Sequence, residues 1–249
     1  KVPLTGRRQI RLMPESTLIQ ASSLSYQHVL DTAKIVKTGA QADMIKRVGV
    51  RISAAVEKYL KENGFESRIA GFNWQFNLIQ DDNVNAWCMS GGKVAFYTGI
   101  MPICKDETGV AVVMGHEIAH AIARHGNERV SQSIVLQGLS TGIDFALLMK
   151  EEPETTRQIL NTAFGVGGQV GMLAFSRKHE SESDEMGLLF MAMAGYDPSE
   201  APKFWDRMNN IGGQRPPVML STHPDPGKRQ ADLQAQLPKA MEIYNQNKR

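Results

Sequence analysis

Residues 107–126 read ETGVAVVMGHEIAHAIARHG, and this stretch decides the fold. Apolar residues recur along it at helical spacing and a glycine follows the last of them, so the pattern predicts a helix from Glu107 to His125. Inside it, residues 116–120 read His-Glu-Ile-Ala-His. The two histidines are four positions apart on one face of the helix, and imidazoles paired in this way are ligands that suit zinc.

Glu117 follows the first of these histidines, His116, and lies beside the face that His116 shares with His120. From there its carboxylate can take a proton from the water that attacks a peptide bond, so we expect it to be the catalytic base. The apolar run from Val110 to Met114 would bury the helix. The alternative is that these are two ordinary histidines with a solvated glutamate.

A catalytic zinc takes three protein ligands and keeps one position open. His125 is at the wrong spacing for the extended metzincin pattern, and we expect it to interact with the end of its own helix. Residues 176–184 supply carboxylates, with Glu180 and Asp184 four positions apart. Glu180 is the expected third ligand, and Asp184 is expected to accept the second N–H of a ligand histidine and fix its tautomer. Glu182 points to another side of the helix and is the weaker candidate.

His223 is the second expected catalytic residue, because it lies in a loop between Thr222 and Pro224. It could stabilise the oxyanion that develops on the substrate. It could instead be a fourth zinc ligand that blocks the open position until the loop moves, or a loop histidine that bonds to backbone.

A small antiparallel sheet is expected before the metal helix. Phe72 to Ile79 alternates apolar and polar side chains, as a half-buried strand does. Asn85 to Cys88 and Lys93 to Thr98 read as two more strands around a Ser-Gly-Gly turn at residues 90–92. Most of the remaining chain has helical patterns, which predicts an α+β fold dominated by helices.

Further helical segments are expected before and after the sheet and the metal helix in the sequence. They are Ser25–Asn63 (one helix, or two in line with a break at Gly39), 128–149, 154–175, 177–194, a helix from Asp197-Pro198 through Met208 and a last helix from near Pro226. Residues 1–25 read as an arm, and residues 26–249 as a single domain.

The edge of the predicted sheet is the expected place for the substrate. A peptide in extended form could add to Asn85, Ala86 and Trp87 through main-chain hydrogen bonds, which demand little of the peptide's sequence. The alternative is a purely structural hairpin.

Composition and charge exclude several other classes of protein. With 42% apolar and 22% charged residues the chain is expected to fold in water. A net charge of +2, with basic residues scattered among acidic ones, makes nucleic acid an unexpected partner. Gln158 to Ser176 is free of charge but not apolar enough to predict a membrane span. Cys88 and Cys104 fit two free thiols, or one disulfide in an oxidising compartment.

Taken together, the motifs resemble the gluzincin zinc metallopeptidases of family forty-eight, the HtpX and CAAX prenyl protease family. The resemblance covers most of the chain and is carried by these stretches: His116–His120, Glu180–Asp184, Thr5-Gly6-Arg7-Arg8, Asn85-Ala86-Trp87 with Gly91-Gly92, Gly195-Tyr196-Asp197-Pro198 and Ser221-Thr222-His223-Pro224. Their order and spacing are similar to those of the soluble bacterial branch that includes BepA and LoiP. Trp87-Cys88-Met89-Ser90 departs from the family pattern, which bears on substrate preference.

This resemblance implies a zincin-like domain that holds one Zn²⁺ per chain. It further implies an exported enzyme of the bacterial periplasm or cell envelope, associated with the membrane peripherally or through a lipid anchor. The expected activity is endopeptidase cleavage of misfolded or unassembled envelope proteins in protein quality control. The alternative is a latched or inactive metallopeptidase fold that binds clients as a chaperone does.

Overall fold

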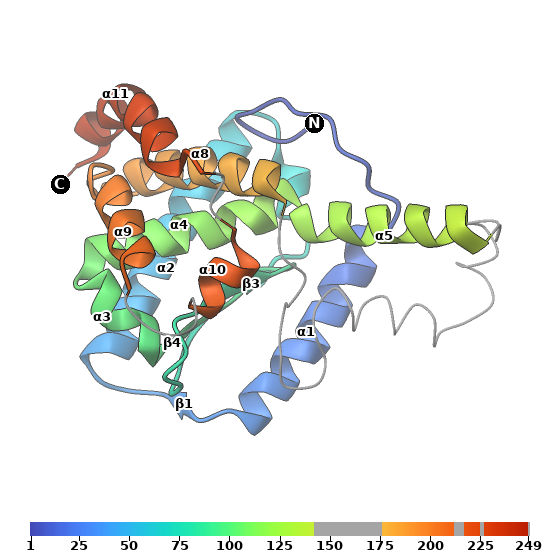
Figure 1. The fold of residues 1–249 in the computed structure, drawn as a ribbon, viewed down its shortest axis with the longest axis horizontal. Coiled ribbons are helices and arrows are strands. Elements are labelled where there is room, and N and C mark those ends of the chain that lie inside the picture. The colour runs from blue at the N-terminus through green and yellow to red at the C-terminus, as the bar shows by residue number, and fades with distance from the viewer. Residues whose placement is uncertain (142–175, 212–216, 225–226, 249) are drawn as a thin grey trace.

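The computed structural model describes residues 1–141, 176–211, 217–224 and 227–248, in which helices pack around a small sheet (Figure 1). This confirms the predicted α+β fold dominated by helices. The described elements are α1 (Glu15–Thr32), β1 (Ile35–Val36), α2 (Ala40–Glu62), η1 (Glu66–Arg68), β2 (Gln75–Ile79), β3 (Ala86–Met89), β4 (Lys93–Tyr97), η2 (Thr98–Ile100), α3 (Met101–Cys104), α4 (Glu107–Ala123), α5 (His125–Thr141), α8 (Arg177–Met193), α9 (Glu200–Asn209), α10 (Val218–Thr222) and α11 (Arg229–Asn247).

Helix α4 lies at the centre of the molecule. Every residue from Gly109 to Ala123 is buried, as the apolar sequence predicts. The side chain of Asp106 caps the helix by accepting hydrogen bonds from the N–H groups of Thr108 and Gly109. The helix ends two residues earlier than predicted, because Arg124 adopts a left-handed conformation with φ 58°.

Helix α8 lies along α4 (Figure 1), and a glycine of each helix is at their contact. A Cβ atom on Gly115 would lie 2.7 Å from the carbonyl oxygen of Gly187, and one on Gly187 would lie 2.7 Å from the backbone nitrogen of His116. Both distances are far shorter than van der Waals contact. The two backbones therefore touch, which brings the N-terminal half of α8 over the metal-motif face of α4.

The sheet is mixed, which corrects the prediction of an antiparallel sheet. Its strand order is β1-β2-β4-β3, and β2 pairs with β4 in parallel. The predicted hairpin of β3 and β4 is antiparallel, with Gly91 and Gly92 at positive φ in its turn. The sequence pattern of a hairpin does not reveal which of its two strands joins the rest of the sheet. Here it is β4, whose first four residues are all buried, and β3 is left at the end.

The two faces of the sheet pack against different helices. Val94 and Phe96 of β4 belong to the main core, which includes α2, α4 and α8. Ala95, between them, belongs to a second cluster that includes Tyr26 of α1. Tyr26 also donates a hydrogen bond from its hydroxyl to the carbonyl of Val94. Helix α1 thus covers one face of the sheet and α4 the other.

Several predicted elements differ in their bounds. The pattern over Ser25–Asn63 resolves into the end of α1, strand β1 and helix α2, with the expected break at Gly39, whose φ is 107°. The predicted helix near 128–149 is described as far as Thr141, within α5, and the one at 154–175 lies outside the described residues. The division into an arm of residues 1–25 and a domain of residues 26–249 stays a prediction.

Two further findings concern the membrane and the cysteines. Among the helices that the structure describes, none combines the length and apolarity needed to cross a bilayer. Cys88 and Cys104 are both free thiols.

The contact of α4 with α8 gives a prediction for Gly187→Ala. At an open helical position this change would raise stability by about 1 kcal/mol. Here the added methyl group would overlap the backbone of α4, so we expect the free energy of unfolding to fall by about 1–3 kcal/mol. Urea denaturation measures it, with Ser181→Ala at a partly exposed position of α8 as the control. A more stable Gly187→Ala variant would contradict the contact.

Candidate metal centre

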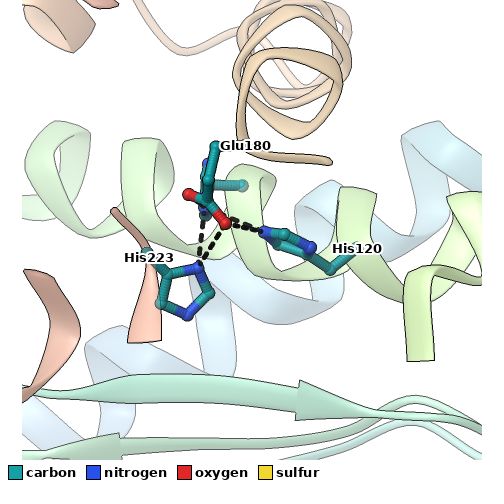
Figure 2. Close-up of side chains that lie close together, drawn as sticks. His120, Glu180 and His223 are labelled. Atoms are coloured by element: carbon teal, nitrogen blue, oxygen red, sulfur yellow. Dashed lines mark hydrogen bonds and ion pairs between the residues drawn. The ribbon is translucent and has the colours of Figure 1, made fainter. Parts of the chain in front are cut away.

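Four buried side chains converge between α4, α8 and the end of α10. They are His116, His120, Glu180 and His223, and one ligand atom from each lies within 4.8 Å of all the others. Glu180 is central to the group: its Oε1 is 3.3 Å from Nε2 of His120 and 3.1 Å from Nδ1 of His223 (Figure 2). The structure thus brings together the three predicted ligands and one of the two predicted catalytic residues.

These residues fit a zinc ion by their chemistry. Three imidazole nitrogens and one carboxylate form a donor set typical of zinc, and all four groups are withdrawn from water. Glu117 lies beside them, 3.6 Å from Nε2 of His223 through its Oε1. That oxygen is buried and has no hydrogen-bond partner in the described part of the chain, so it is available to a molecule that enters the site.

The surroundings shift the pKa of both Glu117 and His116. Burial raises the pKa of Glu117 against the opposing effect of His223 and His116, and a raised pKa makes a carboxylate a better proton acceptor near neutral pH. For His116, burial lowers the pKa but is outweighed by the carboxylates of Asp184 and Glu180, so the pKa rises to about 10. A metal ion that binds His116 must therefore displace a proton.

Asp184 contacts His116, one of the predicted ligands. Its Oδ1 is 2.9 Å from Nδ1 of His116, which leaves Nε2 of that ring facing the cluster. Arg229 was not foreseen. Its guanidinium is buried, donates to Oδ2 of Asp184 at 2.6 Å and to Oε2 of Glu180 at 2.7 Å, and lies 3.9 Å above the ring of Trp205. In the sequence, Arg229 follows Lys228 in an ordinary charged stretch, so no signal marked it.

His125 does not behave as a residue that interacts with the end of its own helix. It begins α5, is fully buried, and its Nδ1 lies 2.9 Å from Nδ1 of His120. The left-handed turn at Arg124 redirects the chain and brings His125 back toward the metal helix. Glu182, the weaker ligand candidate, is outside the four-residue cluster and contacts His125 instead, at 2.8 Å.

The predicted substrate-binding residues lie on β3 and just before it, at the end of the sheet. The side chains of Asn85, Ala86 and Trp87 are all buried. The N–H of Tyr97 donates to the carbonyl of Asn85, so the backbone groups of Asn85 and Trp87 face β4, and those of Ala86 face the other side. A peptide could therefore pair with the backbone of β3, while the side chains serve the core.

Comparisons with known proteins identify similar chains. The sequence pattern of Peptidase family M48 matches residues 49–237, more than half of the chain. The chain is 34% identical over 199 residues to Mitochondrial metalloendopeptidase OMA1 of Arabidopsis thaliana, an alignment that covers 78% of this chain and 38% of the relative. It is 32% identical over 224 residues to the protein of the same name from Schizosaccharomyces pombe, covering 85% and 63%.

A bacterial relative is also similar. The Beta-barrel assembly-enhancing protease of Escherichia coli is 31% identical over 164 residues, covering 64% of this chain and 33% of the relative. The chain thus spans less than two thirds of the length of each of these relatives.

Arg229 gives a prediction about stability. Arg229→Met would remove the guanidinium that the buried carboxylates of Asp184 and Glu180 share, so we expect the zinc-free protein to lose about 3 kcal/mol of unfolding free energy. Arg47→Met removes an arginine that is paired with Glu107 on the surface and serves as the control, with a far smaller loss expected. Chemical denaturation compares the two variants, and equal losses would contradict the buried role of Arg229.

Proposed function

The chain belongs to peptidase family M48 and carries its zinc metallopeptidase domain, and from this premise we propose that it is an endopeptidase of protein substrates. The observation that supports the proposal most strongly is the buried group of His116, His120, Glu180 and His223 beside Oε1 of Glu117, which has no hydrogen-bond partner among the described residues. A donor set of this kind, with a carboxylate next to it that is not one of the ligands, suits hydrolysis better than a purely structural site, which usually closes with four Cys or His ligands.

We assign His116, His120 and Glu180 to hold one zinc ion. When bound, zinc supplies a Lewis acid that polarises a carbonyl group and lowers the pKa of water from about 15.7 toward about 7. Asp184 accepts a hydrogen bond from Nδ1 of His116 and so keeps the lone pair of Nε2 directed at the cluster. Arg229 holds the carboxylates of Asp184 and Glu180 in place by donating a hydrogen bond to each.

Glu117 is the proposed general base. Its Oε1, which has no hydrogen-bond partner in the described part of the chain, accepts a proton from the attacking water, and the same carboxyl then delivers that proton to the nitrogen of the departing amine. Burial, which raises its pKa, keeps the carboxylate ready to accept a proton near neutral pH. One residue thereby serves both transfers.

His223 is better placed as a fourth ligand than as an oxyanion stabiliser. Its Nδ1 lies 3.3 Å from Nε2 of His116 and 3.1 Å from Oε1 of Glu180, within the ligand group itself. A fourth protein ligand would close the position that a substrate needs. We therefore propose that this arrangement is a latched state, and that His223 must move away before cleavage.

The proposed substrate is an extended segment of a protein. Such a segment can pair with the outward backbone groups of Ala86 on β3, next to the metal helix. In this proposal Asn85, Ala86 and Trp87 act through the main chain of β3 and not through their side chains, which are buried. Recognition through backbone alone leads to broad sequence specificity, in keeping with misfolded or unassembled proteins as substrates.

A second candidate function follows from the closed position of His223. If the latch never opens, the protein would bind unfolded clients without cleaving them, as a chaperone does. Casein digestion with and without a chelator separates the two, since only a peptidase produces fragments that a chelator abolishes.

A further part of the proposal concerns the location of the protein in the cell. The expected bacterial periplasm or cell envelope agrees with the similarity to a β-barrel assembly-enhancing protease, while the OMA1 relatives are mitochondrial. A peripheral or lipid-anchored association with the membrane stays a prediction. Fractionation of cells that produce the full-length protein tests both.

Glu117→Gln gives the principal test of the mechanism. The amide cannot accept the proton, so we expect casein cleavage to fall by about 10²–10⁴-fold while zinc content stays at one per chain. Glu185→Gln, on α8 and partly exposed, is the matched control and should keep full activity. By contrast, Glu180→Gln should deplete zinc. Cleavage that survives in Glu117→Gln would exclude this residue as the base.

His223→Ala distinguishes a latch from a stabiliser. If His223 closes the fourth coordination position of zinc, the variant should bind zinc less tightly, because it has one ligand fewer. It should also cleave casein faster, because that position is open to substrate in every molecule. A loss of kcat by about 10²-fold or more would instead show that His223 stabilises the transition state. Zinc content and kcat are measured on the same samples.

A further inference from the structure

A chain of polar contacts connects the N-terminal arm with His120. Nδ1 of His120 is 2.9 Å from Nδ1 of His125, and Nε2 of His125 is 2.8 Å from Oε2 of Glu182. Arg7 donates to the same oxygen of Glu182 at 2.8 Å, and Thr5 donates to the other oxygen at 2.5 Å. The arm passes over the region where the first turns of α8 and α5 meet (Figure 1). The contacts therefore run from residue 5 to a proposed zinc ligand.

The contacts allow only one arrangement of protons that serves a metal. Nε2 of His120 faces Glu180, so this nitrogen must be free of a proton to bind zinc, and Nδ1 must carry one. That proton is donated to Nδ1 of His125. His125 then carries its own proton on Nε2 and donates it to Glu182, whose carboxylate can only accept.

Arg7 holds the carboxylate of Glu182 in position, together with Thr5 and His125, which contact the same carboxylate. Arg7 also makes a two-pronged contact with Glu128 of α5, with both N–O distances at 2.7 Å. It therefore fastens α5 to α8, the two helices that supply His125 and Glu182.

The surroundings of His125 support the same orientation. The ring of His179 stacks on it with centroids 4.3 Å apart, and the hydroxyl of Ser183 lies 3.3 Å from its Nδ1. His125 is fully buried, so water does not compete for these contacts. The other proposed ligand histidine, His116, has a similar set of partners. Asp184 contacts its Nδ1, and Arg229 donates a hydrogen bond to Asp184.

We propose that Thr5 and Arg7 of the N-terminal arm are positioning residues for the zinc site, acting through Glu182 and His125 to fix the tautomer of His120. The proposal rests on the proposed function, in which His120 holds zinc. Partners behind metal-bound histidines typically change metal affinity by 10–100-fold. The arm thus belongs to the metal site through Glu182 and His125.

The experiment compares Arg7→Gln with Arg8→Gln in the full chain. Arg8 is adjacent and exposed, so its replacement removes the same charge from the same arm without touching Glu182. The dissociation constant for zinc is measured by competition with a chromophoric chelator, and the melting temperature is measured without and with zinc. We expect Arg7→Gln to bind zinc about 10-fold more weakly and to gain less melting temperature from zinc, while Arg8→Gln matches the wild type.

Glu182→Gln and Glu182→Leu provide a second measurement that does not alter the arm. Gln keeps an acceptor for Nε2 of His125 and Leu does not, so zinc affinity should fall in the order wild type, Gln, Leu. In cobalt-substituted protein the visible absorption bands should change in the same order, because they report ligand geometry. This measurement stands even if Arg7→Gln does not fold.

Two results would overturn the proposal. One is a lower melting temperature of the zinc-free Arg7→Gln protein with an unchanged zinc dissociation constant, which would make the arm a purely structural strap. The other is an equal loss of zinc affinity in Arg7→Gln and Arg8→Gln, which would show a general effect of charge. Failure of the wild type to bind zinc would refute the proposed function instead, so the two failures are distinct.

Discussion

Contact between the bare backbones of Gly115 and Gly187 sets the position of α8 on α4. Helices that pack through larger side chains lie about 8–10 Å apart, and the glycines allow a closer approach. His116 directly follows Gly115, and Glu180 lies two turns before Gly187. Main-chain contact therefore places the carboxylate of Glu180 next to the imidazoles of α4. The geometry of the site depends on how closely the two helices pack.

Close packing of this kind concentrates charge in the interior, and the structure balances it with arginines. Glu180 and Asp184 share Arg229, while Glu182 and Glu128 share Arg7. An unpaired buried carboxylate would be costly, so each arginine stabilises the folded chain as well as the ligand geometry. The two arginines come from opposite ends of the sequence and contact different carboxylates of α8.

The relations that the sequence could predict are those between residues close together in the chain. The ligand pair on α4 and the relation of Glu180 to Asp184 follow from helical periodicity, since spacings of four residues share a face. The role of His125 escaped prediction because it depends on the left-handed backbone of Arg124, a conformation that a non-glycine residue rarely adopts. Arg229 and the parallel pairing of β2 with β4 depend on contacts between distant segments, which periodicity does not report.

The wide sequence separation within the metal site has a consequence for how the protein matures. Arg7 contacts Glu182 across 175 positions, and Asp184 meets Arg229 across another 45. Segments that emerge from the ribosome early must wait for those that emerge last, because the full set of partners exists only after residue 229 has been made. Nascent chains that end before residue 229 are thus expected to lack the complete set of side chains around the metal centre.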